Sequence, residues 1–201
     1  MKTLVIATAN KGKAQEFQAL FADYPVTIKT LLDFPEIGEI EETGTTFAEN
    51  AALKAETVAN LLNIPVLADD SGLIVDYLDG APGVYSARYA GDGHDDKKNN
   101  KKLLKNLTGV PYEQRTARFH CTLAIAVPQQ QTIFYSGEVS GYITEEERGA
   151  SGFGYDPLFY LPNYQKTMAE IAASEKNKIS HRANALAKLA KDIDILIQKI
   201  D

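Results

Sequence analysis

The chain has 201 residues, of which 44% are hydrophobic and 24% charged, which is typical of one globular domain with a buried core. Its formal net charge of −6, with no long run of lysine or arginine, excludes general binding to nucleic acid or to an anionic membrane surface. The single cysteine, Cys121, excludes a disulfide framework, and no apolar run has the length of a signal-peptide core or a membrane span, so a cytoplasmic protein is predicted.

The first third of the chain predicts a strand followed by two helices. Residues 3–7 are apolar and β-rich, and the polar residues 8–13 separate them from a helical pattern in the residues that follow. The apolar face of this pattern consists of Ala14, Phe17, Leu20 and Phe21. Residues 35–42 predict an irregular acidic loop. Residues 46–49 match a capping box, so a second helix is expected to begin there and to end near Asn63.

The middle of the chain predicts a buried strand that carries two acids at its end. The apolar residues 64–68 have the length of such a strand, and Asp69 and Asp70 follow them directly. The next pair, Ser71 and Gly72, is typical of a turn, with another strand over residues 72–78. Two ionised carboxylates side by side repel each other, so their pairing favours a bound cation.

Alternation and helical periodicity predict the remaining elements. They are a lysine-rich helix over residues 97–107, a half-buried strand over 116–127, its antiparallel partner over 132–139, a glycine-rich loop over 149–157 and a helix over 180–200. No repeat or linker divides the chain. The prediction is therefore a single α/β domain over residues 1–201.

Three polar residues, Thr8, Asn10 and Lys13, lie at the first strand-to-helix junction. Threonine and asparagine there can be explained as helix caps. Lys13 is harder to explain by stability, because a cation in the first turn opposes the positive end of the helix dipole. A bound anion would resolve this conflict, since the N–H groups at a helix start bind phosphate. The multiple glycines of a P-loop are absent, so this is a different kind of phosphate site.

Four acids supply candidate metal ligands. Glu41 and Glu42 precede the second helix, where acids are favourable in any case. Together with Asp69 and Asp70 they provide hard oxygen ligands of the kind that Mg²⁺ prefers. Zinc would require histidines or thiolates, and the three histidines of the chain are scattered.

Two segments in the C-terminal half indicate recognition of a base. Residues 152–157 combine glycines with Phe153 and Tyr155, and such a loop can stack on a planar ring, although glycine and proline also form ordinary turns. Ser180 predicts a helix N-cap, after which His181 and Arg182 occupy a first turn that prefers acids. Basic groups at that position indicate a ligand of negative or carbonyl character.

Five ordered motifs, spread over nearly the whole chain, resemble the inosine triphosphate pyrophosphatase family of the Ham1 type. They are TANKGK at residues 8–13, EETGTTFAENA at 41–51, ADDSGL at 68–73 with GAPGVYSAR at 80–88, GFGYDP at 152–157, and ISHR at 179–182. The resemblance implies an α/β fold with an elongated mixed β-sheet flanked by helices, in two lobes with a central active-site cleft. It also implies a homodimer and Mg²⁺ as the cofactor.

The activity that this resemblance implies is hydrolysis of ITP, dITP and XTP to the monophosphate and pyrophosphate, which removes non-standard purines from the nucleotide pool. Asp70 would be the general base and, with Glu41, a metal ligand, while Glu42 and Asp69 stay open as alternates. Lys13 would also take part in catalysis. The implied substrate contacts are Thr8, Ala9, Asn10, Lys11, Gly12, Lys13, Ser71, Phe153, Gly154, Tyr155, Asp156, Lys176, His181 and Arg182.

Two other functions remain open. A Maf-type nucleotide pyrophosphatase would use a related architecture, but it lacks the Ser180-His181-Arg182 signature. A nucleotide-binding sensor without turnover would have little need of a general base, which disfavours it.

Overall fold

The computed structural model describes residues 2–8, 10–38 and 40–199 of the chain. In these residues seven strands form one sheet in the order β2-β1-β3-β4-β5-β6-β7. The sheet is mixed, because β1 pairs in parallel with β2 and β3, whereas β6 pairs antiparallel with β5 and β7. The predicted α/β class is therefore confirmed. In the part of the chain just given, no helix is long and apolar enough to cross a membrane.

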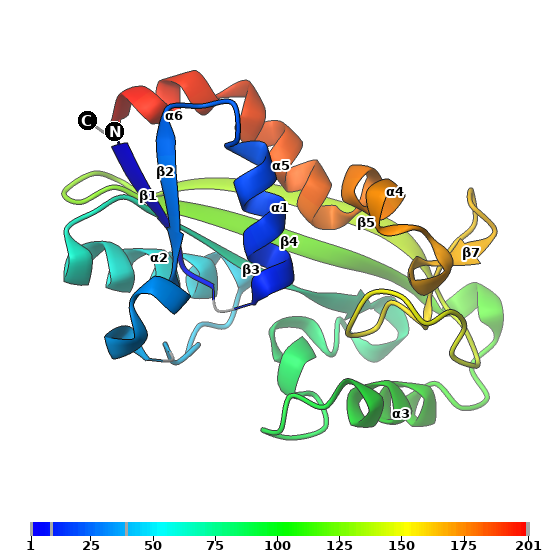
Figure 1. Ribbon diagram of the computed structural model, residues 1–201. Coiled ribbons are helices and arrows are strands. Elements are labelled where there is room, and N and C mark those ends of the chain that lie inside the picture. The colour runs from blue at the N-terminus through cyan, green and yellow to red at the C-terminus, as the bar shows by residue number, and fades with distance from the viewer. Residues whose placement is uncertain (1, 9, 39, 200–201) are drawn as a thin grey trace. The chain divides into compact units, whose positions relative to one another are not determined.

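The elements have the following bounds (Figure 1). The strands are β1 (Lys2–Ile6), β2 (Val26–Thr30), β3 (Val66–Val75), β4 (Thr116–Ala126), β5 (Ile133–Ile143), β6 (Phe159–Leu161) and β7 (Lys166–Thr167). The α-helices are α1 (Lys11–Leu20), α2 (Phe47–Leu62), α3 (Asp96–Asn106), α4 (Ala173–Ile179), α5 (His181–Lys191) and α6 (Ile193–Lys199). The 3₁₀ helices are η1 (Leu31–Asp33), η2 (Pro35–Ile37), η3 (Asp76–Leu78), η4 (Gly83–Arg88), η5 (Tyr112–Gln114) and η6 (Met168–Glu170).

The chain divides into two compact units, and the division falls within β3, β4, β5 and α5. Unit 1 comprises Met1–Asp70, Cys121–Gly137 and Ala185–Asp201. Unit 2 comprises Ser71–His120 and Glu138–Asn184. The phosphate and metal candidates predicted from the first third of the chain, with Asp69 and Asp70, belong to unit 1, and the base-recognition candidates belong to unit 2.

Unit 1 buries both faces of its strands. On one face, Leu4 and Leu67 pack against Phe17 of α1 and Leu189 of α5. The other face packs against α2, and its buried residues include Val5, Val66, Ala68, Ala55 and Val58. Figure 1 shows α1 and α2 on opposite sides of these strands. Complete burial of one aliphatic side chain of this size stabilises a fold by about 1.5–3 kcal/mol, so both helices are firmly held.

Unit 2 has a core of its own beneath α3. Leu103 and Leu107 of this helix are fully buried and pack with Phe119 of β4 and Phe159 of β6. The buried Arg115 donates hydrogen bonds to the carbonyl oxygens of Leu107, Ile143 and Thr144, which satisfies the C-terminal end of α3.

The prediction that a strand ends at Asp69 and Asp70 is wrong. β3 continues without a break from Val66 to Val75, through Ser71 and Gly72. It pairs with β1 at Val66 and Leu67 and is hydrogen-bonded to β4 in the sheet, so sheet pairing rather than the local turn preference of Ser-Gly sets the conformation of this strand. Side chains alternate along a strand, so Asp69 and Asp70 lie on opposite faces rather than side by side.

The helix predictions differ in accuracy. The capping box is confirmed, because the Thr46 hydroxyl accepts from the Glu49 N–H at 3.1 Å. The predicted end near Asn63 is also confirmed, since α2 ends at Leu62 and Asn63 is its C-cap in a left-handed conformation. The helix predicted over residues 180–200 is two helices, α5 and α6. At Asp192 the backbone N–H bonds to the Leu189 carbonyl, three residues back, which breaks the α-helical pattern. The elements β2, β6, β7 and α4 were missed in the sequence.

Candidate functional site

Lys13 and Asp69 form an ion pair at the start of α1. Asn10 caps this helix: its Oδ1 accepts from the Lys13 N–H at 3.1 Å, and its own N–H donates to Thr8 Oγ1 at 3.1 Å. The Lys13 Nζ lies 2.9 Å and 3.1 Å from the two oxygens of Asp69. The first turn of α1 contains no acid. This helix end therefore combines N–H groups, a hydroxyl and an ammonium group, which together suit an anion.

Two further residues predicted in this segment are described only in part. Lys11 and Gly12 are the first residues of α1, so their backbone belongs to the helix start. Ala9 lies outside the described residues.

Asp70 lies on the opposite face, beside α2. The Lys54 Nζ lies 2.5 Å from Oε1 of Glu42 and 3.6 Å from Oδ1 of Asp70. The Asn50 amide also lowers the pKa of Asp70, and its Oδ1 accepts from the Gly44 N–H at 2.7 Å. Lys54 was not predicted from the sequence. Its signal is that Asn50 and Lys54 are four residues apart, so two polar side chains interrupt the apolar face of α2.

Burial raises the pKa of the Asp70 carboxyl from its ordinary value of 3.8 to about 6. The Lys54 ammonium opposes this rise, whereas the negative charges of Glu42 and Asp69 add to it. Burial also tends to lower the pKa of Lys54, but Asp70, Asp69 and Glu42 outweigh it and the pKa is raised. A carboxylate whose pKa is close to neutrality is suited to accept a proton as a general base.

The carboxylates of this group fit the chemistry of a divalent cation. Asp70 and Glu42 both lie near one cation, the Lys54 ammonium, and carboxylate oxygens are the ligands that Mg²⁺ prefers. Glu41 is exposed, and it makes no hydrogen bond or ion pair with the described residues. In residues 2–8, 10–38 and 40–199, no three His, Cys, Asp or Glu side chains are already gathered as a metal centre.

In unit 2, the predicted base-site residues Phe153 and Asp156 come together with Lys176, which was expected to add charge at the triphosphate. The buried Asp156 carboxylate forms an ion pair with Lys176 and accepts from the Phe153 N–H at 3.0 Å. The Lys176 Nζ lies 4.7 Å from the centre of the Phe153 ring, which is 49% exposed. An exposed aromatic ring beside an ammonium group can stack on a planar, electron-rich ligand.

The two aromatic residues of this loop have different environments, and Tyr155 is the buried one. Its side chain is buried in the core of unit 2, and its hydroxyl donates to the Ser86 carbonyl at 2.7 Å. Burial raises the pKa of this hydroxyl. Its ring therefore anchors the loop, and Phe153 is the aromatic ring exposed beside it.

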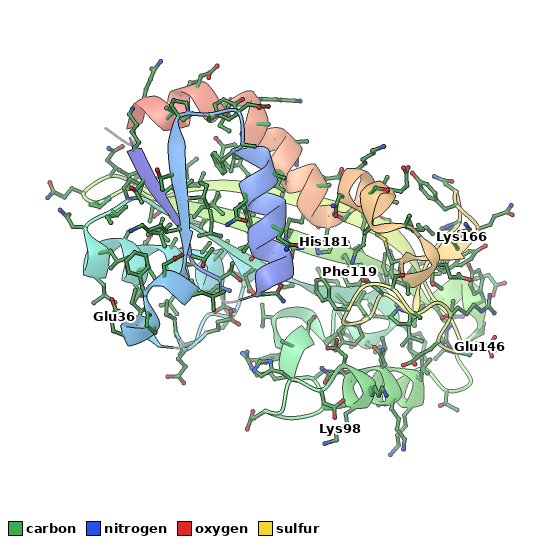
Figure 2. The ribbon with its side chains drawn as sticks, in the orientation of Figure 1. Glu36, Lys98, Phe119, Glu146, Lys166 and His181 are labelled. Atoms are coloured by element: carbon green, nitrogen blue, oxygen red, sulfur yellow. The ribbon has the colours of Figure 1, made fainter. Side chains whose placement is uncertain are left out.

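His181 and Arg182 begin α5 and are both buried, with Ser180 as the cap that accepts from the Ala183 N–H at 3.1 Å. The His181 ring stacks on Phe119, with ring centres 5.0 Å apart and planes 19° apart, and Figure 2 labels both side chains. Ser71, the last of the predicted contacts, lies half-buried in β3. The stacking fixes the orientation of the imidazole, which suits a hydrogen-bonding role.

A model described as the Ham1 family matches residues 4–192 of the chain. The chain belongs to the Ham1 family. The resemblance found in the five motifs is thus confirmed at the level of the family.

Individual relatives agree with this assignment over their full length. The dITP/XTP pyrophosphatase of Listeria monocytogenes serotype 4b (strain F2365) is 67% identical over 200 residues, which cover 100% of this chain and 98% of the relative. That of Geobacillus kaustophilus (strain HTA426) is 60% identical over 189 residues, which cover 94% and 93%. The solved Ham1 protein of Staphylococcus aureus has a TM-score of 0.89 at 43% identity, covering 96% of this chain and 98% of that one. A HAM1 protein from Coxiella burnetii has a TM-score of 0.91 at 40% identity, covering 98% and 100%.

The buried charge of Asp70 leads to a prediction about stability in this Ham1-family chain. Since the pKa is about 6 in the folded state, the folded protein binds more protons than the unfolded chain between pH 3.8 and about 6. The contribution of Asp70 to the free energy of unfolding is therefore most favourable at acid pH and becomes less favourable as the pH rises from 3.8 to about 6. We expect Asp70→Asn to raise the free energy of unfolding by about 1–3 kcal/mol at neutral pH, less toward acid pH.

Denaturant titration in EDTA at several pH values would measure this difference. The control is Asp92→Asn, which removes the charge of an exposed loop residue. A gain in stability for Asp70→Asn that does not change with pH would contradict the prediction.

Proposed function

We propose that the chain hydrolyses ITP, dITP and XTP to the nucleoside monophosphate and pyrophosphate. Membership of the Ham1 family and 67% identity over 200 residues with the dITP/XTP pyrophosphatase of Listeria monocytogenes support this activity. The single observation in the structure that carries it is the buried Asp70 carboxyl with its raised pKa, placed beside Lys54 and Glu42. A protein that only binds nucleotides has no need of such a group.

The triphosphate would bind at the start of α1. Thr8, the Asn10 amide and the N–H groups of residues 11 and 12 would donate hydrogen bonds to phosphate oxygens, and the Lys13 ammonium would add positive charge. The capped helix end and the absence of an acid in its first turn support this assignment. Phosphoryl transfer depends mainly on positioning and on neutralising charge, and these groups supply both.

Asp70 would act as the general base. Water attacks the α- or the β-phosphorus of the triphosphate, its proton passes to a carboxylate oxygen of Asp70, and the phosphoanhydride bond between these two phosphorus atoms breaks, which gives the monophosphate and pyrophosphate. Such pyrophosphatases are generally metal-dependent. We propose Mg²⁺, held by Asp70 and Glu41, as the ion that neutralises the phosphate charge when it is bound. Glu42, which lies with Asp70 beside Lys54, and Asp69, which pairs with Lys13, are the alternative ligands.

The purine would be recognised by residues of unit 2. The exposed Phe153 ring would stack on the base, with Asp156 and Lys176 holding the loop. Hypoxanthine and xanthine carry a 6-oxo group where adenine carries a 6-amino group. Hydrogen-bond donors from His181 and Arg182 would satisfy the oxygen and would face the amino group of adenine unfavourably.

Pyrophosphate release from ITP, XTP, ATP and GTP, with Mg²⁺ and with EDTA, tests this proposal. We expect turnover of ITP and XTP to exceed that of ATP by about a hundredfold or more, because ATP lacks the 6-oxo group, and EDTA to abolish it. GTP shares the 6-oxo group, so its turnover measures a discrimination that the His181 and Arg182 donors do not supply. Binding of ITP without turnover of any substrate would instead support a nucleotide-binding sensor.

We also propose a homodimer in the cytoplasm whose ligands are small nucleotides rather than nucleic acid. The net charge of −6 supports the second point, because a polyanion would be repelled by an acidic protein. Light scattering of the purified protein would test the dimer through its mass.

A further inference from the structure

Helix α3 holds the peptide groups on both sides of Gly154. The Gly154 N–H donates to Oδ2 of Asp96 at 2.7 Å, and the Gly154 carbonyl accepts from Nδ2 of Asn100 at 3.2 Å. Asp96 and Asn100 are four residues apart, so both side chains project from one face of α3. One helix face thus fixes the donor and the acceptor of a single loop residue.

The loop needs such external support because its own conformation is unusual. Gly152 and Gly154 have φ values of +81° and +63°, in the left-handed region that favours glycine. A Cβ on Gly152 would lie 2.1 Å from Oδ2 of Asp156, so the backbone also approaches this carboxylate too closely for any other residue. Two flexible glycines therefore flank Phe153 in the chain.

The helix that gives this support is itself well anchored. Leu103 and Leu107 are fully buried, and Arg115 donates a hydrogen bond to the Leu107 carbonyl at the end of α3. Asn100 is 3% exposed and also donates to Oε1 of Glu147 at 3.1 Å.

The stability of the fold alone does not explain why an asparagine occupies position 100. Its Oδ1 is buried, and among the described residues it accepts no hydrogen bond. A buried polar atom without a partner is costly, so the hydrogen bonds that the amide donates must offset this cost. One of these bonds goes to the loop that carries Phe153.

The residues on either side of Gly154 show what its hydrogen bonds to Asp96 and Asn100 orient. On one side, Tyr155 is anchored by its buried hydroxyl, and on the other side the Phe153 ring is exposed. The Gly154 peptide groups are therefore the link between a fixed residue and an exposed ring. Fixing them limits the directions that the ring can take.

We propose that Asp96 and Asn100 are positioning residues that order the 152–156 turn before the purine binds. The inference rests on the proposed function, in which Phe153 stacks on the base. A turn that is ordered in advance loses less conformational entropy on binding, so the affinity for the base is higher. The two residues touch the loop and act on the ligand only through it.

The test compares two ligands in isothermal titration calorimetry with Mg²⁺ present: IMP, which carries the base, and inorganic tripolyphosphate, which does not. We expect the double variant Asp96→Ala/Asn100→Ala to bind IMP about tenfold more weakly, with tripolyphosphate within about twofold of wild type. With ITP as substrate, KM should rise about tenfold while kcat stays within about threefold. Asp96→Asn should restore most of the affinity when Asn100 is intact, since an amide oxygen still accepts from the Gly154 N–H.

The matched control is Asp95→Ala. Asp95 caps α3 by accepting from the Lys98 N–H at 3.1 Å, so its removal weakens the same helix end without touching Gly154. Equal loss of IMP affinity in Asp95→Ala would overturn the inference, because helix stability would then explain the effect. Wild-type protein that binds IMP no better than the double variant would also overturn it. Wild-type protein that neither binds IMP nor hydrolyses ITP would overturn the proposed function as well.

Discussion

Replacement of Asp70 by asparagine should reduce kcat for ITP by about a thousandfold or more, while the dissociation constant of ITP changes by less than about fivefold. The amide has nearly the shape of the carboxylate, so the packing beside Asn50 and Lys54 should persist. It cannot accept the proton of the attacking water. Single-turnover kinetics and equilibrium binding would separate the two effects. A variant that kept more than about a tenth of wild-type turnover would rule out Asp70 as the base.

The structure supplies controls for this experiment. Asp69→Asn removes the neighbouring carboxylate, but Asp69 lies on the other face of β3 and pairs with Lys13. We therefore expect it to raise KM through weaker triphosphate binding, with a smaller effect on kcat than Asp70→Asn. Glu36→Gln changes an exposed acid, labelled in Figure 2, and should alter neither constant.

Replacement of Arg182 by alanine should lower the preference for ITP over ATP by about a hundredfold, through loss of a donor to the 6-oxo group. Affinity for inorganic tripolyphosphate should fall much less. Arg182 is 3% exposed, so the truncation also leaves a cavity, and Arg182→Met provides a second variant that keeps most of the side-chain volume.

The measurement is kcat/KM for ITP and for ATP with each variant. Lys178→Ala, which removes a positive charge from the exposed surface of α4, controls for the general effect of lost charge. Equal losses for ITP and ATP in both Arg182 variants would exclude Arg182 from base selection.

Sequence patterns predicted correctly those helices and strands that are determined by residues close together in the chain. The Thr46 and Glu49 capping box fixed the start of α2, and Asn10 and Ser180 were found as helix caps. The alternation over residues 116–127 predicted β4, whose odd-numbered residues Ala117, Phe119 and Cys121 are buried. These patterns succeed because a cap or an amphipathic face is decided by neighbours in the sequence.

Predictions failed where a distant segment decides the conformation. Ser71 and Gly72 favour a turn locally, but they lie in the continuous strand β3, whose conformation is set by its pairing in the sheet. The local sequence does not distinguish Tyr155 from Phe153, and only the core of unit 2 decides that the Tyr155 ring is buried. Lys54 was overlooked because its partners, Glu42 and Asp70, are 12 and 16 residues away in the sequence.

The sequence by itself determined the family, the α/β class and the kinds of side chain that are available for the reaction. Short motifs such as TANKGK and ADDSGL contain these side chains within a few consecutive residues. Only the tertiary structure decided which charges meet. It places Asp69 against Lys13 and Asp70 against Lys54 on opposite faces of one strand, and it places Gly154 between Asp96 and Asn100 of α3. The physical reason is that a pKa, an ion pair or an ordered loop depends on burial and on distances between atoms, which packing sets between segments that are remote in the chain.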